Sequence, residues 1–101
     1  MLVLGAGRMG LGAVHDLVSQ SDVTEVTVAD FDRSKADDIA RRYPEKARAA
    51  QIDCNDQAAV VALMRGHASA ISCVNYWLNE RLARAAIEAG THFCDLGGNN
   101  D

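Results

Sequence analysis

The sequence has few of the residues that would mark a metal centre, a disulfide framework or a membrane segment. Its three cysteines are odd in number and lie far apart with no C-x-x-C pair, and its three histidines are equally scattered. This spacing shows no zinc constellation and favours reduced thiols packed in or near strands. No apolar stretch approaches the roughly 20 residues of a membrane span. We therefore expect a cytoplasmic protein without a metal ion.

An excess of charge of one sign is also missing. The chain carries 14 acidic and 10 basic side chains, for a net charge of −4, and the basic residues form no cluster. That balance argues against nucleic acid or an anionic membrane surface as the main partner. The hydrophobic fraction of 49% is that of a globular protein. A chain of 101 residues forms one domain at most, without room for a separate substrate domain.

The chain alternates short apolar runs with longer segments of helical period. The apolar runs predict five strands, at residues 1–4, 23–29, 47–52, 68–74 and 91–96. Apolar residues at helical spacing predict four helices, at residues 9–19, 34–43, 55–66 and 78–89. Ser34 is the expected N-cap of the second helix, and Asn55 or Asp56 that of the third. Together they predict an α/β fold, a doubly wound parallel sheet in the order 3-2-1-4-5 with helices on both faces.

The stretch GAGRMG joins the first predicted strand to the first predicted helix. Gly5, Gly7 and Gly10 follow the spacing G-x-G-x-x-G of Rossmann-type dinucleotide-binding domains. Gly5 would permit the tight turn, Gly7 the approach of a pyrophosphate, and Gly10 the close packing of the helix. The backbone N–H groups around Arg8 and Met9 would point at the phosphates. The motif predicts a dinucleotide cradle.

An acidic residue completes this fingerprint at the end of the second predicted strand. Asp30 follows Gly10 by 20 residues, and there a carboxylate can accept hydrogen bonds from the adenosine ribose and repel a 2′-phosphate. We therefore expect NAD as the cofactor, with NADP as the less favoured alternative that Arg33 would permit, since this side chain lies close enough to pair with a phosphate. Two alternatives remain: Asp30 could simply end the strand, or the domain could bind S-adenosylmethionine. The glycine turn of such methyltransferases usually reads G-x-G-x-G, however, and position 9 is methionine.

The stretch AISCVNYWLNERLARAAIEAGTHFCDLGG, with GAGRMG and VTVAD before it, carries a more specific likeness. Over essentially the whole chain the sequence resembles the N-terminal cofactor domain of the saccharopine dehydrogenase family, and within it lysine 6-dehydrogenase and its relatives. The resemblance implies NAD(P)-dependent hydride transfer at an amine-bearing carbon, through an imine. It also implies that residues 1–101 are part of a longer two-domain enzyme. The other domain would bind a small amino-acid substrate and form a homo-oligomer.

The resemblance also implies site residues beyond the glycine motif. Tyr76 would face the substrate as a catalytic residue. Further cofactor contacts would come from residues that follow the third, fourth and fifth strands: Asp53, Cys54, Val74, Asn75, Leu96, Gly97 and Gly98. Each role has a structural alternative. Asp53 could cap a turn, Asn75 could cap the fourth helix, and Tyr76 with Trp77 could meet another domain.

A second function class shares the same motif. A non-catalytic domain that senses NAD and regulates another protein would also carry G-x-G-x-x-G and an acid at a strand end. The segment from Val74 to Gly98 does not resemble such domains. The sequence therefore favours the oxidoreductase, with the sensor as the alternative.

We expect Gly7→Val to abolish dinucleotide binding, because the branched side chain would occupy the space through which the pyrophosphate approaches. Calorimetric titration of the folded variant with a dinucleotide checks this. Unchanged affinity would show that the glycine motif is not a cradle.

Overall fold

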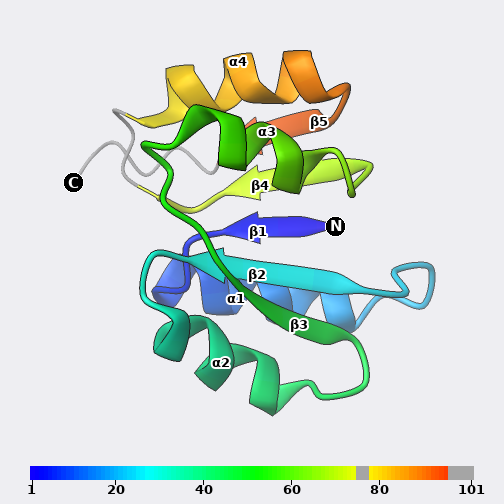
Figure 1. Cartoon of the computed structure of the whole chain (residues 1–101). Coiled ribbons are helices and arrows are strands. Elements are labelled where there is room, and N and C mark those ends of the chain that lie inside the picture. Colours follow the sequence, from blue (N-terminus) through cyan, green and yellow to red (C-terminus); the bar gives the residue numbers. More distant parts are fainter. Residues whose placement is uncertain (75–77, 96–101) are drawn as a thin grey trace.

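Five parallel strands form one sheet in the order β3-β2-β1-β4-β5, in a computed structural model that describes residues 1–74 and 78–95 (Figure 1). The strands are β1 (Leu2–Leu4), β2 (Val26–Asp30), β3 (Ala47–Gln51), β4 (Ser69–Ser72) and β5 (His92–Asp95). The helices are α1 (Arg8–Val18), α2 (Arg33–Arg42), α3 (Gln57–Met64) and α4 (Asn79–Ala89). The predicted fold class and strand order are confirmed.

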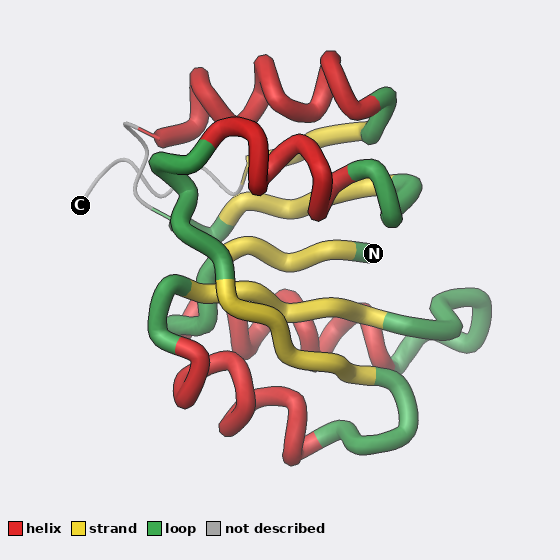
Figure 2. The backbone as a smooth tube through the Cα atoms, viewed as in Figure 1, coloured by secondary structure: helices red, strands yellow, loops and turns green. Residues whose placement is uncertain are grey.

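Helices cover both faces of the sheet, α1 and α2 on one face and α3 and α4 on the other (Figure 2). All three residues of β1 are fully buried between them. Leu2 and Leu4 belong to the hydrophobic core under α3 and α4, whereas Val3 belongs to the core under α1 and α2. The alternation follows from the pleat of a strand. The short central strand therefore joins the two cores.

The start of α2 differs from the expectation. Asp32, not Ser34, is the N-cap: its carboxylate accepts hydrogen bonds from the N–H of Ser34 at 3.0 Å and from the Ser34 hydroxyl at 2.6 Å. A charged acceptor binds these donors more strongly than a hydroxyl would, and they hold the pKa of the Asp32 carboxyl below its usual range. For α3, Asp56 is the N-cap and accepts from the N–H of Ala59 at 3.1 Å.

Strand boundaries differ slightly from the predicted ones. β2 begins at Val26 rather than at Val23, because the N–H of Val23 is engaged in a turn with the carbonyl of Gln20 at 3.3 Å. β4 ends at Ser72 rather than at Val74, although the N–H of Cys73 still donates to the carbonyl of Leu4 at 2.7 Å. The local sequence predicts where the apolar runs lie, but the hydrogen bonds to neighbouring strands determine where each strand begins and ends.

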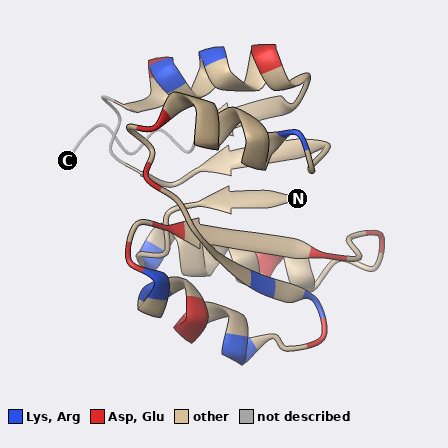
Figure 3. Cartoon of the chain, viewed as in Figure 1, with Lys and Arg blue, Asp and Glu red and all other residues tan. Residues whose placement is uncertain are grey.

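Charged side chains lie mainly on the helices and connecting loops, and β1 and β4 carry none (Figure 3). β2 carries one, Asp30 at its carboxyl end. Within the described ranges no helix is long and apolar enough to cross a membrane. The cytoplasmic location stays a prediction.

α1 packs against the loop that precedes it at a distance that only glycine allows. A Cβ added to Gly10 would lie 1.9 Å from the carbonyl oxygen of Gly5. Gly12 is one half-turn further along the same helix, and a Cβ there would meet nothing within 4 Å. Gly10 was expected to let the helix pack closely on the sheet, but its close contact is with the glycine loop. A Cβ on Gly10 would lie 4.0 Å from the Cγ1 of Val3 on β1, which is an ordinary contact.

Alanine at these two positions should change stability in opposite directions. We expect Gly12→Ala to raise the free energy of unfolding by about 0.5–1 kcal/mol, the helix propensity of alanine over glycine. We expect Gly10→Ala to lower it by about 1–3 kcal/mol or more, because the helix must move off the loop. Urea unfolding followed by circular dichroism measures both. Equal stability of the two variants would contradict the contact.

Candidate functional site

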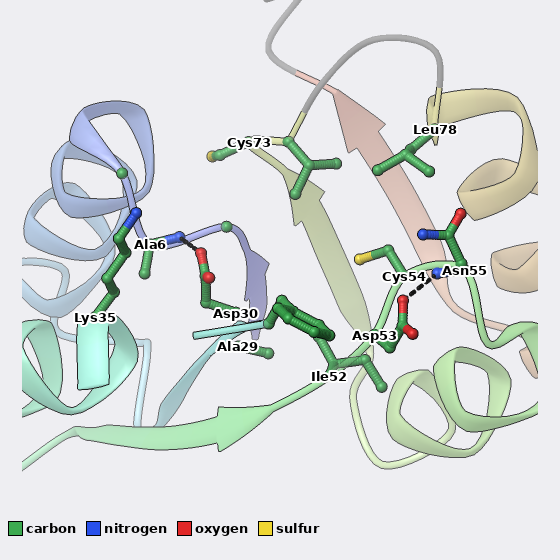
Figure 4. A pocket seen from close by; sticks show the side chains of 14 residues that line it. Ala6, Ala29, Asp30, Lys35, Ile52, Asp53, Cys54, Asn55, Cys73 and Leu78 are labelled. Carbon is green, nitrogen blue, oxygen red and sulfur yellow. Dashed lines mark hydrogen bonds between the residues drawn. The ribbon is translucent and has the colours of Figure 1, made fainter. Parts of the chain in front are cut away.

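The loops that follow the first four strands enclose a cleft of about 650 Å³ at one edge of the sheet (Figure 4). Its walls come from the carboxyl ends of β1, β2, β3 and β4, with side chains added from α2 and from the start of α4. The cleft lies where the strand order reverses, because β2 and β4 flank β1 on opposite sides. In open parallel sheets this switch point is where ligands bind.

The glycine-rich loop turns the chain out of β1 and into α1. Gly5 has a φ of +106°, and a Cβ there would lie 2.8 Å from the carbonyl oxygen of Cys73. Gly7 is different, because a Cβ there would meet nothing within 4 Å and would project into open space. Gly7 is also the N-cap of α1, and no side chain caps this helix. The N–H groups of the first turn have no partner within the helix and are available to an anion.

Asp30 connects two loops of the site through its carboxylate. Oδ2 accepts a hydrogen bond from the N–H of Ala6 at 2.7 Å (Figure 4), and Oδ1 accepts one from the N–H of Asp32 at 2.8 Å. The first bond fixes the glycine-rich loop against the end of β2. Both oxygens thus accept hydrogen bonds from the main chain, and the two N–H dipoles stabilise the carboxylate charge.

The other end of the cleft follows β3. Asp53 accepts a hydrogen bond from the N–H of Asn55 at 2.9 Å, so its turn-capping role is present, while it also lines the cleft (Figure 4). Phe31 is 69% exposed and lines the same cleft together with the buried Ile52. An exposed aromatic ring beside an aliphatic side chain offers a flat apolar surface to a planar ligand.

Two half-buried thiols complete the lining. Burial raises the pKa of Cys73 to about 11. Burial, and then the charges of Asp53 and Asp30, raise the pKa of Cys54. Both side chains are therefore neutral thiols at neutral pH and contribute packing rather than nucleophiles. Cys94 lies in a strand, β5, as expected, but its side chain is exposed rather than packed.

The cleft brings together six of the residues expected from sequence: Gly5, Gly7, Asp30, Asp53, Cys54 and Val74. Gly10 is buried beneath the loop, Arg8 lines a neighbouring hollow, and Met9 is 42% exposed and lines neither. Five others lie outside the described residues: Asn75, Tyr76, Leu96, Gly97 and Gly98. No three His, Cys, Asp or Glu side chains of the described part could jointly hold a metal ion.

Sequence reasoning missed several lining residues. Phe31 had a signal, since it directly follows the acid at the end of β2. Lys35 had none, because it reaches the cleft from the first turn of α2 only through the packing of that helix. The main-chain N–H of Ala6 had none either, because any residue type would supply it.

A parallel sheet with a cleft at its switch point and an uncapped glycine turn defines a dinucleotide-binding domain of the Rossmann class. The family model described as "Saccharopine dehydrogenase NADP binding domain" matches residues 1–100. The chain belongs to that family, and the predicted family is confirmed.

Individual relatives agree with this placement. The saccharopine dehydrogenase [NADP(+), L-glutamate-forming] of Schizosaccharomyces pombe is 31% identical over 94 residues, which are 93% of this chain and 20% of that protein. The structure of saccharopine dehydrogenase (L-Glu forming) from Saccharomyces cerevisiae superposes with a TM-score of 0.82 at 24% identity, over 93% of this chain and 20% of that one. The structure of an NADPH-dependent quinone oxidoreductase of Escherichia coli in complex with NADPH superposes with a TM-score of 0.72 at 17% identity, over 93% of this chain and 35% of that one. The last two show the fold alone.

The expectation of NAD is wrong, since both the family and the Schizosaccharomyces pombe relative are NADP proteins by description. The geometry of Asp30 gives the physical reason. Its two oxygens already accept from the N–H groups of Ala6 and Asp32, so the side chain is committed to holding the loops. Such a carboxylate is a weaker repellent for a 2′-phosphate than a free one.

We expect Asp30→Ala to reduce the affinities for NADPH and NADH by a similar factor, because the glycine-rich loop loses its fixed position. Stability should fall by about 1–3 kcal/mol, the cost of leaving a partly buried N–H unpaired. Asp32→Ala is the matched control: it removes the side-chain cap of α2 but leaves the hydrogen bond that holds the glycine-rich loop in place. Calorimetry and urea unfolding provide both readouts. A loss confined to NADH would contradict the loop-holding role.

Proposed function

We propose that the chain binds NADP(H) in the switch-point cleft, as the cofactor domain of an amino-acid oxidoreductase that transfers a hydride at an amine-bearing carbon. The observation that carries this proposal is the uncapped glycine turn at the cleft, within a chain of the saccharopine dehydrogenase NADP-binding family. The similarity to the Schizosaccharomyces pombe saccharopine dehydrogenase supports the substrate class. The family match also favours the enzyme over the regulatory sensor.

The glycine turn would hold the pyrophosphate. The N–H groups of Gly7, Arg8 and Met9 stand at the open amino end of α1, and the partial positive charge of the helix attracts the phosphates. Gly10 keeps α1 tight against the loop and so fixes the direction of these donors. The donors need no rearrangement on binding.

The adenosine half would lie across the ends of β2 and β3. Phe31 and Ile52 supply the apolar surface for the adenine ring, with Asp53 and Cys54 beside them. Each oxygen of Asp30 retains a lone pair for a ribose hydroxyl in addition to its main-chain donor.

The nicotinamide half would lie toward the end of β4. NADP, when bound, supplies the ring that accepts or donates the hydride. Val74 and Leu78 give that end an apolar lining that excludes water. Tyr76, with Asn75, Leu96, Gly97 and Gly98, lies outside the described residues; we propose these as the substrate-side and nicotinamide contacts.

The chain spans about a fifth of the length of its saccharopine dehydrogenase relatives. Hydride transfer needs a substrate held against the cofactor. We propose that the remainder of the substrate site and the homo-oligomer contacts belong to sequence outside these 101 residues.

Calorimetric titration of the purified chain with NADPH and, in parallel, NADH tests the binding function. We expect saturable one-to-one binding with the higher affinity for NADPH. Gly12→Ala is the matched control, since it alters the exposed side of α1 and should bind like the wild type. A folded chain that binds neither dinucleotide, or NADH more tightly, would contradict the proposal. The reaction class is tested separately, by NADPH formation when a full-length protein containing the chain is given NADP⁺ and saccharopine.

A further inference from the structure

A second hollow lies on the other side of the glycine-rich loop from the cleft, between α1 and α2. It has a volume of about 340 Å³. Gly7 and Arg8 line it from the start of α1, and Lys35 and Arg42 line it from α2, together with one carboxylate, that of Asp38. Three cations thus face a small volume beside the uncapped end of α1.

The carboxylates of α2 do not neutralise these cations. Asp37 pairs with Arg33 at 3.2 Å, and Asp38 pairs with Arg41. Asp32 accepts hydrogen bonds from the N–H and hydroxyl of Ser34 and has a weaker charge interaction with Lys35. None of the ion pairs within residues 1–74 and 78–95 includes Arg8, Lys35 or Arg42. The hollow therefore has positive charge in excess of its protein partners, which is what a bound anion requires.

The hollow borders the cofactor cleft. Ala6, Gly7 and Lys35 line both. Lys35 extends from α2 toward the loop beside Ala6 (Figure 4), and basic residues stand at the amino ends of both α1 and α2 (Figure 3). Asp30, where the adenosine ribose would lie, is bonded to the N–H of Ala6 at this border. A group attached to the ribose would therefore lie close to the hollow.

We propose that this hollow is the site of the 2′-phosphate of NADP, with Arg8 and Lys35 as its hydrogen-bond donors and Arg42 adding positive potential. The inference rests on the proposed function and identifies the residues that distinguish NADP from NAD. Arg8 presents a planar fork to the phosphate oxygens and Lys35 a compact charge. Together they offset the remaining negative charge of Asp30, so the acid at the strand end coexists with NADP.

Arg33 is excluded from this role by its contacts. It was the phosphate partner that the sequence suggested, but it pairs with Asp37 and lines a different hollow beside β3, which does not include the glycine loop. The phosphate site is thus built from α1 and the side of α2 that carries Lys35, not from the side that carries Arg33.

The test compares ligands that differ only in the 2′-phosphate: NADPH with NADH, and adenosine 2′,5′-bisphosphate with 5′-AMP. We expect Lys35→Ala and Arg8→Ala each to weaken the binding of NADPH and of the bisphosphate about tenfold, which is the loss for one charge-assisted hydrogen bond. The affinities for NADH and 5′-AMP should stay within about twofold of the wild-type values. Arg33→Ala is the matched control, because it removes the same charge from the same helix and should leave the NADPH-to-NADH ratio unchanged. Circular dichroism confirms that each variant is folded.

Salt and free phosphate provide a second readout. NADPH binding to the wild type should weaken more steeply with ionic strength than NADH binding, and the two slopes should converge in the Arg8→Ala, Lys35→Ala double variant. Inorganic phosphate should compete with NADPH and spare NADH; competition with both would place free phosphate in the pyrophosphate cradle instead.

Three results would overturn the assignment while the proposed function stands: equal losses for NADPH and NADH, no loss in either variant, or a loss in Arg33→Ala alone. A folded wild type that binds no dinucleotide would overturn both.

Discussion

Three main-chain segments meet at Gly5, and the space between them admits no side chain. A Cβ on Gly5 would lie 2.8 Å from the carbonyl of Cys73, and a Cβ on Gly10 would lie 1.9 Å from the carbonyl of Gly5. The ends of β1 and β4 and the first turn of α1 are therefore fixed by contacts between backbones. The mouth of the cleft and the direction of the first N–H groups of α1 depend on this junction, because no flexible side chain lies between its parts.

Negative and positive charges occupy different parts of the site: a carboxylate lies at the cleft, and cations line the neighbouring hollow. The carboxylate of Asp30 accepts hydrogen bonds from the N–H groups of Ala6 and Asp32 and so holds two loops. Its negative charge therefore serves the structure of the site before it affects any ligand. Arg8 and Lys35 line the neighbouring hollow and take part in none of the ion pairs of the described residues. An acid at the end of the second strand therefore does not decide the cofactor by itself. Its consequence depends on which donors it already accepts from and which cations lie beside it.

Local patterns determined what could be predicted from sequence. The apolar runs and the glycine spacing act within a few residues, and they were sufficient for the strand order and for the cleft residues Gly5, Gly7 and Asp30. The partner of Asp30 is 24 residues away along the chain, and the position of Lys35 depends on how α2 packs. Neither contact can be read from local sequence, so the hydrogen bond of Asp30 to the glycine-rich loop was missed and the cofactor preference was wrong.

The cations beside the cleft stand on surfaces that neither hydrophobic core uses. Arg8 and Lys35 are exposed and belong to no buried cluster, whereas Gly5 and Gly10 are buried at the junction of β1 and α1. Cofactor preference and foldability are thus separable traits in this domain. During evolution, single surface substitutions can change which nicotinamide dinucleotide the domain prefers. The glycine turn that binds either dinucleotide is more constrained, because its substitution would also disturb the fold.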